Sequence, residues 1–224
     1  MGAYFITGTG TDIGKTWLAC TLLRHWSDAG VAVAAFKPVL SGFDPAQPAA
    51  SDAGALLAAL GRPAGAAELD AIAPWRFAAP LSPDMAAARE GRAIDFDQLV
   101  AFTRRCAGAD SGAVLVEGVG GAMVPLDATH TVRDWIVASG LRCVLVAGSY
   151  LGSLSHTLTA LEALARVGAG VTAIAVNETP GSTVTLESTL ESLSRFTAGI
   201  PVVTIARGSP QGGIARLGSL LSGT

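Results

Sequence analysis

A short glycine-rich turn joins the first apolar segment of the chain to its first amphipathic segment. The turn reads GTGTDIGKT over residues 8–16; it follows the apolar residues 3–7 and precedes a stretch, 16–29, whose apolar residues recur at helical spacing. A strand, a turn with little side-chain bulk and a helix in this order aim several backbone N–H groups and the positive end of a helix dipole at one point. This order predicts a phosphate-binding loop, in which Lys15 contacts the terminal phosphates and the Thr16 hydroxyl holds Mg2+.

The spacing of this turn is a variant of the standard pattern. The standard pattern would place the first glycine at Thr9, whereas the leading glycine here is Gly8. A turn of glycine, lysine and threonine also arises by chance in ordinary loops. The succession of strand, turn and amphipathic helix favours the phosphate-binding interpretation over a chance loop.

Lysine is rare in this chain. Of its fifteen basic residues, thirteen are arginines and two are lysines, Lys15 and Lys37. A compact ammonium is not replaced by a planar guanidinium, so both lysines are candidates for functional sites, although genome composition also explains such a bias. Lys37 follows the apolar segment 31–36 and precedes Pro38, which cannot continue strand pairing. We therefore expect Lys37 at the carboxyl edge of a sheet, where open parallel sheets bind ligands, with Ser41 in the loop beyond.

Composition narrows the class of protein and of partner. Half of the 224 residues are hydrophobic, which is enough for a sizeable core, and residues 1–224 are predicted to form one domain. A net charge of −3 with scattered arginines argues against nucleic acid or an anionic membrane surface as the main partner. No apolar segment approaches the roughly 18 uncharged residues of a membrane span, and the first residues lack the features of a secretory signal. We expect a cytoplasmic protein with small-molecule partners.

The cysteines and histidines give no metal-ligand pattern. The cysteines are odd in number, far apart and set in apolar stretches, which predicts buried thiols. The histidines are also far apart and are expected on helix faces or in loops. These residues are Cys20, Cys106 and Cys143, and His25, His130 and His156.

Apolar strand-like segments alternate with helix-like segments along the chain. This alternation predicts an α/β fold, a mostly parallel sheet covered by helices on both faces, of the P-loop NTPase type. The further strands are expected at 31–36, 112–117, 143–147, 171–176 and 202–205, and the further helices at 51–61, 96–107, 153–166 and 182–197. Residues 62–83 cannot be assigned beyond loops and short turns, and their structure is left open.

Two acidic residues are candidates for the same magnesium site. Glu117 ends the apolar strand 112–117 and is followed by glycines, which allow close backbone approach to a ligand. An acid at the end of a strand next to the phosphate loop suits a magnesium ion held opposite the Thr16 hydroxyl. The alternative for Glu117 is a solvated strand end, and for Asp52 it is helix capping beside Ser51.

Together these segments resemble the dethiobiotin synthetase family. The resemblance extends from the first strand to about Asn177 and weakens in the last forty residues. The segments that carry it are the turn 8–16, the sequence KPVLSG at 37–42, Ser51-Asp52, EGVGG at 117–121, Pro80-x-Ser82-Pro83 and Leu151-Gly152.

The resemblance implies an ATP-dependent ligase reaction. In this family, 7,8-diaminononanoate takes up CO2 on one amine as a carbamate, the carbamate attacks the γ-phosphate, and the second amine closes the ring to give dethiobiotin, ADP and phosphate. A carbamate and a triphosphate are both anionic, so aligning them requires fixed positive charge. By resemblance, Lys15 holds the β- and γ-phosphates and Lys37 contacts γ-phosphate and carbamate, with Mg2+ as the cofactor.

The resemblance also assigns binding residues and a partner. The resemblance implies that magnesium is bound by Thr16, Asp52 and Glu117. The nucleotide falls to Asp12, Ile13, Gly14, Lys15, Thr16, Trp17, Asp52, Glu117, Gly118, Val119, Gly120, Asn177, Glu178, Ser209, Pro210 and Gln211. The diamine falls to Thr11 and Ser41, and its carboxylate to Gly152, Ser153 and Leu154 at a helix N-terminus of a second subunit, which implies a homodimer with shared sites.

Asn177 matches the residue that reads adenine in the family, because an amide pairs with both a donor and an acceptor on the base. A turn residue before Pro180 is the alternative.

Two other activities share the sheet and loop. One is a deviant P-loop ATPase switch regulated by a protein partner, which usually carries a signature lysine early in the loop; residues 9–13 contain none. The other is an amidating ligase of the cobyrinate type, which usually needs an amidotransferase domain that this chain is too short to hold. The residues favour the synthetase over both.

Overall fold

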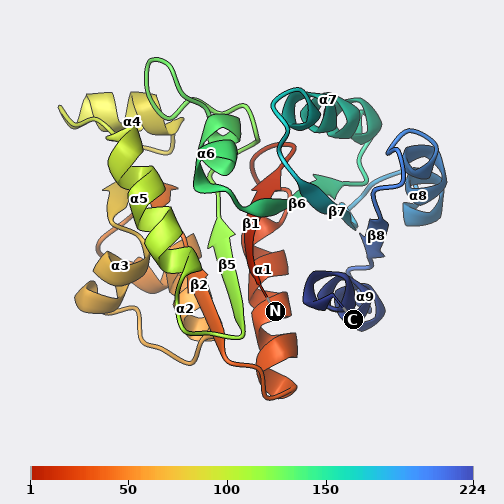
Figure 1. Cartoon of the computed structure of the whole chain (residues 1–224), viewed down its shortest axis with the longest axis horizontal. Helices are drawn as coiled ribbons and strands as arrows, with labels where there is room; N and C mark the ends of the chain where they lie inside the picture. Colours follow the sequence, from red (N-terminus) through yellow and green to blue (C-terminus); the bar gives the residue numbers. More distant parts are fainter. Residues whose placement is uncertain (1, 224) are drawn as a thin grey trace.

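The computed structural model describes residues 2–223 and contains a six-stranded parallel sheet (Figure 1). The strand order is β2-β5-β1-β6-β7-β8, and every pairing between these neighbours is parallel. The strands are β1 (Ala3–Gly8), β2 (Val33–Phe36), β5 (Ala113–Glu117), β6 (Arg142–Gly148), β7 (Val171–Asn177) and β8 (Val202–Ile205). The expected α/β fold class is confirmed.

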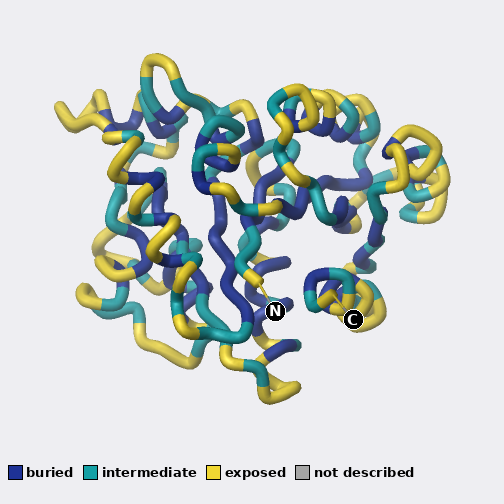
Figure 2. The backbone as a smooth tube through the Cα atoms, in the orientation of Figure 1, coloured by how far each residue is buried: buried dark blue, intermediate teal, exposed yellow. Residues whose placement is uncertain are grey.

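Helices cover both faces of this sheet because alternate strand residues point to opposite faces. One apolar core lies under α1 (Lys15–Asp28), α2 (Asp52–Ala59), α3 (Ala66–Ile72) and α9 (Gln211–Ser222). The other receives residues of α4 (Pro83–Arg89), α5 (Phe96–Ala107), α6 (Val132–Ser139), α7 (Ser153–Ala165) and α8 (Leu186–Ser194). In Figure 2 the central strands are mostly dark blue, whereas yellow, exposed residues lie in the outer turns of the helices and in the loops. Strands covered on both sides read as continuous apolar runs, which is why residues 113–117 show no polar alternation.

Pro38 has a more local effect than the sequence predicts. It ends pairing in the main sheet at Phe36, but the chain pairs again at once as β3 (Val39–Ser41). The carbonyl of Pro38 accepts a hydrogen bond of 3.1 Å from the backbone of Trp75, and β3 forms a separate parallel pair with β4 (Trp75–Phe77). The proline lacks only a donor, so its acceptor still starts this second sheet.

Residues 62–83, which the sequence leaves unassigned beyond loops and short turns, contain α3 and β4. Both elements are too short to show a periodic pattern. The expected helix 182–197 is limited to α8. Thr185 is the N-cap, because its side chain accepts a hydrogen bond from the backbone N–H of Ser188. Ser182 lies before the helix, where its hydroxyl donates to the carbonyl of Ser149. Strand β2 begins two residues later than expected, at Val33.

Helices α4, α6 and α9 were not expected at all. The glycines at 212, 213 and 218 lower the helix propensity of α9, yet packing of Ile214, Leu217 and Leu221 into the core retains it. The signal for α6 was present as a capping box formed by Thr131 and Asp134. In the described residues no helix is both long and apolar enough to cross a membrane.

Candidate active site

The phosphate-binding loop has glycine where a side chain would collide with its neighbours. A Cβ atom at Gly8 would lie 2.4 Å from Cδ1 of Ile13 and 3.3 Å from the carbonyl of Val146. Gly14, at φ 86°, places its α-hydrogen against the amide of Asn177, where a Cβ atom would come within 2.6 Å of Nδ2. Glycine at position 8 therefore leaves room for the Ile13 side chain and for the close approach of the loop to β6.

Helix α1 begins directly after this loop. No side chain caps its first turn, so its first backbone N–H groups are available to an anion. Asp12 has a positive φ of 56°, a left-handed conformation that aspartate tolerates better than most residues. Of the nucleotide-binding residues expected at 12–17, all but Ile13 line one cavity.

Lys15 is buried at the floor of the loop. Its Nζ donates a hydrogen bond of 2.8 Å to the carbonyl of Gly10. Burial, and then the charge of Lys37, lower the pKa of Lys15 from 10.5 to about 8. An anion bound in the loop would oppose both effects, so the ammonium of Lys15 is placed to favour a phosphate.

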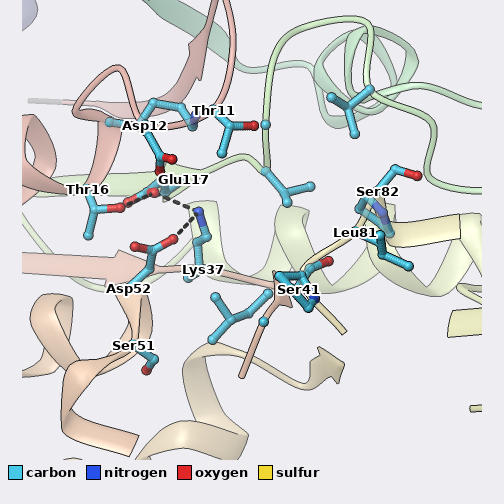
Figure 3. A pocket seen from close by; sticks show the side chains of 18 of the residues that line it. Thr11, Asp12, Thr16, Lys37, Ser41, Ser51, Asp52, Leu81, Ser82 and Glu117 are labelled. Atoms are coloured by element: carbon cyan, nitrogen blue, oxygen red, sulfur yellow. Dashed lines mark hydrogen bonds and ion pairs between the residues drawn. The ribbon is translucent and has the colours of Figure 1, made fainter. Parts of the chain in front are cut away.

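Lys37 lies one residue beyond β2 and meets the end of β5 (Figure 3). Its Nζ donates hydrogen bonds to Oε1 of Glu117 at 2.6 Å and to the carbonyl of Gly118 at 2.7 Å, and it lies 3.1 Å from Oδ2 of Asp52. Burial alone would lower the pKa of Lys37, but the charges and hydrogen bonds of Glu117 and Asp52 outweigh it and raise the pKa above its usual value. The lysine is therefore a buried cation.

Glu117 connects the lysine to the phosphate loop. Its Oε1 also accepts a hydrogen bond of 2.7 Å from the hydroxyl of Thr16, the first turn of α1. Its Oε2 is buried and has no hydrogen-bond partner within residues 2–223. An unpartnered buried carboxylate oxygen is costly unless something binds it. Glu117 is thus a positioned acid, not the solvated strand end that was its alternative.

Asp52 is freed from capping by its neighbour. The Ser51 hydroxyl accepts the backbone N–H of Gly54 at the start of α2, so the cap is Ser51. The carboxylate of Asp52 points instead at Lys37, and although burial opposes it, the charge of Lys37 holds the pKa of Asp52 below its usual value. Helix capping, the alternative interpretation of Asp52, is therefore excluded.

Thr16, Asp52 and Glu117 fit a magnesium ion better than a transition metal. Mg2+ prefers oxygen ligands, keeps several waters and uses one or two carboxylates together with substrate phosphates. The unpartnered Oε2 of Glu117 is a carboxylate oxygen of the kind that Mg2+ binds. Over the described residues there is no group of three or more His, Cys, Asp or Glu side chains that could hold a metal ion.

These side chains open onto a cavity of about 880 Å3. Beyond the charged cluster, its wall is made by the loop after β3 and by the segment leading into α4. The Oγ atoms of Ser41 and Ser82 are buried without hydrogen-bond partners in the described chain. The cavity is lined by Thr11, Asp12, Gly14, Lys15, Thr16, Trp17, Lys37, Leu40, Ser41, Gly42, Ala50, Ser51, Asp52, Pro80, Leu81, Ser82, Pro83, Glu117, Val119, Gly120 and Val124.

Other expected site residues lie outside this cavity. Asn177 ends β7 and its Nδ2 donates to the carbonyl of Ile13 at 2.8 Å, while its Oδ1 is buried without a partner in residues 2–223. Glu178 accepts the backbone N–H of Arg207, which ties the end of β7 to the loop after β8. Ser209 and Pro210 complete that loop and Gln211 begins α9. Gly152, Ser153 and Leu154 form the start of α7 and do not line the cavity of their own chain.

Comparison with known proteins gives the family. Residues 2–209 match a family model described as an AAA domain. The ATP-dependent dethiobiotin synthetase BioD of Acidiphilium cryptum (strain JF-5) is 54% identical over 202 residues, covering 90% of this chain and 91% of that protein. The chain belongs to the dethiobiotin synthetase family. The proteins of the same name from Methylobacterium nodulans and Caulobacter sp. (strain K31) are each 46% identical and each match 93% of this chain, with 94% and 89% of their own lengths covered.

Solved structures outside the dethiobiotin synthetase family share the fold. The MinD cell division protein of Aquifex aeolicus superposes with a TM-score of 0.60 at 12% identity, covering all of this chain and 98% of that one. MinD of Pyrococcus furiosus gives 0.56 at 14% identity, over 100% and 99%. At such low identity the likeness concerns the fold alone.

Some cavity residues of this dethiobiotin synthetase family member had no role in the sequence interpretation. Ser82 was noted only within Pro80-x-Ser82-Pro83, and Val124 not at all. The signal for Ser82 was the position before a proline that starts a helix, where serine normally caps the first turn. In the structure the Ser82 side chain makes no such cap, and its hydroxyl stays unpaired beside the cavity.

Proposed function

We propose that this protein catalyses the ATP-dependent carboxylation and ring closure of 7,8-diaminononanoate with CO2, which gives dethiobiotin, ADP and phosphate. The observation that carries the proposal is the cluster of Lys37, Glu117, Asp52 and Thr16 beside the phosphate loop. It combines a buried ammonium with two carboxylates and a hydroxyl. Membership of the dethiobiotin synthetase family supports this reaction, and the charges of the cluster are suited to it.

The reaction needs two anions brought into line. One amine of the substrate adds to CO2 and loses a proton, which gives a carbamate. A carbamate oxygen attacks the γ-phosphorus and ADP leaves, forming a carbamic–phosphoric anhydride. The second amine then attacks the carbamate carbon, the C–O bond to phosphate breaks, and that oxygen leaves with inorganic phosphate. Each step moves negative charge between carbamate and phosphate, which fixed cations stabilise.

Lys15 and Lys37 are the residues that we assign to this charge. Lys15 lies in the loop and would hold the β- and γ-phosphates. Lys37 lies on the cavity side of the loop and would contact both γ-phosphate and carbamate. Thr16, Asp52 and Glu117 would hold Mg2+, which when bound neutralises charge on the phosphates. Neither lysine has to act as a base.

The diamine would occupy the part of the cavity beyond Lys37. Thr11 and Ser41 line it there, and the unpaired Ser41 hydroxyl can donate to a carbamate or accept from an amine. The base of ATP is assigned to the other side of the loop. There the unpartnered Oδ1 of Asn177 would accept from the 6-amino group of adenine, with Glu178 and residues 209–211 nearby in the same pair of loops.

A homodimer with shared sites is part of the proposal. If Gly152, Ser153 and Leu154 bind the substrate carboxylate, they must do so in another copy, since they do not line the cavity of their own chain. Sedimentation of the protein tests the dimer. Mixing inactive Lys37→Met protein with an inactive Ser153→Glu protein tests the sharing, because mixed dimers would regain one intact site and measurable activity.

The experiment that tests the function is phosphate release from Mg-ATP, with and without 7,8-diaminononanoate plus bicarbonate, together with the mass of the organic product. The proposal predicts release that requires the diamine and yields the cyclic urea. Diamine-independent hydrolysis with no new product would replace the proposal by the deviant P-loop ATPase switch, whose fold this chain shares.

A further inference from the structure

The ammonium of Lys37 has no free donor. It carries three N–H groups, and three oxygens surround it: Oε1 of Glu117, the carbonyl of Gly118 and Oδ2 of Asp52. Its side chain is only 2% exposed. In this arrangement Lys37 cannot also bind a carbamate or a phosphate, so the role proposed for it requires that some of these contacts be broken.

The residues that hold Lys37 include Glu117 and Asp52, which are both assigned to magnesium. Oε1 of Glu117 already accepts from both Lys37 and Thr16, and Oδ2 of Asp52 lies 3.1 Å from the Nζ of Lys37 (Figure 3). A magnesium ion would lie about 2 Å from such oxygens. Two cations beside the same two carboxylates would repel each other strongly, because Lys37 and Glu117 are buried and buried charges are weakly screened.

We propose that Lys37 is the resident cation of the magnesium site: it neutralises Asp52 and Glu117 in the metal-free protein, and Mg2+ displaces it. The inference rests on the proposed function, from which it takes the magnesium ligands. One exchange then does two things. It keeps two carboxylates from facing each other without a counter-ion, and it releases the Lys37 ammonium toward the cavity at the moment when metal and nucleotide arrive.

Lys15 provides a matched comparison for this exchange. It is the second buried ammonium of the site, and its positive charge weakens the binding of other cations there in the same way. Its Nζ, however, is bonded to the carbonyl of Gly10 and contacts neither carboxylate. Removing Lys15 therefore removes the same charge from the site without freeing a metal ligand.

The test is Mn2+ binding, followed by its paramagnetic resonance signal, to nucleotide-free wild-type, Lys37→Met and Lys15→Met protein. The inference predicts that Lys37→Met tightens Mn2+ binding about tenfold or more, the scale of one charge-assisted hydrogen bond. Lys15→Met should tighten it less than about threefold. Unchanged binding in Lys37→Met, or equal tightening in both variants, would overturn the inference, because general repulsion would then explain the effect.

A second measurement needs no variant and covers the case in which Lys37→Met does not fold. Wild-type protein is acetylated with and without saturating Mg2+, and the two lysines are compared by mass spectrometry. The inference predicts that labelling of Lys37 rises severalfold with Mg2+ while that of Lys15 does not. Continued protection of Lys37 in saturating Mg2+ would overturn it. If the protein made no cyclic urea, the proposed function would be wrong, but the Mn2+-binding and acetylation results would not change. The proposed function and the displacement of Lys37 by Mg2+ can therefore fail separately.

Discussion

Replacing Glu117 by glutamine should destabilise the metal-free protein by about 3 kcal/mol. The change keeps the size of the side chain but leaves the Lys37 ammonium, 2% exposed, without its buried counter-charge. Removing one partner of a buried ion pair costs about 3–5 kcal/mol. The remaining carboxylate, Asp52, is 44% exposed and lies 3.1 Å away, so it offsets part of the loss and places the expected cost at the lower end of that range.

Urea unfolding in EDTA, followed by tryptophan fluorescence at a fixed protein concentration, measures this cost. With a slope of about 2–3 kcal/mol per molar urea, the midpoint should fall by about 1–1.5 M. Asp70→Asn is the matched control, because it removes the same charge from an ion pair with Arg76 whose carboxylate is 68% exposed. Such exposed pairs contribute about 0–1 kcal/mol, so the control should barely move the midpoint.

A double-mutant cycle decides whether the pair itself is responsible. Lys37→Met combined with Glu117→Gln removes both buried charges, so the double variant should be more stable than the sum of the single effects predicts, by about 2 kcal/mol. Two results would contradict a strong coupling between Lys37 and Glu117. One is a loss of unfolding free energy in Glu117→Gln as small as that in Asp70→Asn, and the other is strict additivity in the cycle.

Three further predictions concern the loop and the lysines. Lys37→Ala should depress kcat much more than nucleotide affinity, and Lys37→Arg should restore little, because a guanidinium fork does not fit a site that surrounds a compact ammonium; steady-state kinetics with full rescue by arginine would contradict this. The pKa of Lys15 is lowered by burial from 10.5 to about 8, so the unfolded chain binds more protons between these values. The free energy of unfolding contributed by Lys15 should therefore rise with pH from about 8 to 10.5, and urea titrations of Lys15→Met should lack this rise. Asn177→Ala should weaken ATP binding and reduce the preference for ATP over GTP in competition assays, since it removes both the unpartnered Oδ1 and the bond to the carbonyl of Ile13; unchanged preference would remove Asn177 from the base site.

Local patterns predicted the elements that carry the site. The strand, turn and helix around residues 8–16 lie where the sequence places them, and Lys37 lies at the carboxyl edge of the sheet as expected. The first position of the loop could be named but not explained from the sequence. Gly8 lies close to Ile13 and to the carbonyl of Val146, and the second of these comes from a strand more than a hundred residues away.

The contacts among the charged residues could not be predicted from the sequence. Lys37 and Glu117 are 80 residues apart, and Thr16 and Glu117 are 101 apart, so only the strand order β2-β5-β1 brings them together. That Ser51 caps α2 and leaves Asp52 for Lys37 is a matter of side-chain direction, which spacing does not determine.

The far wall of the cavity was missed for a different reason. Residues 80–83 contribute to it, between β4 and α4, and these flanking elements of three and seven residues are too short for a periodic signal. Helix α9 was hidden by its glycines. Where tertiary packing overrides local preference, the sequence alone gives the wrong element or none.

The attack of a carbamate on ATP, proposed to occur beside Lys15 and Lys37, would transfer one oxygen of bicarbonate to the phosphate that is released. The protein is given Mg-ATP, 7,8-diaminononanoate and freshly dissolved bicarbonate fully labelled with oxygen-18, and the phosphate formed before the label exchanges with water is analysed by mass spectrometry. Attack by a carbamate oxygen predicts one labelled oxygen in each phosphate, because the bridging oxygen of the anhydride then comes from the carbamate. Phosphate without label would mean that water attacks ATP, and the proposed chemistry would be wrong.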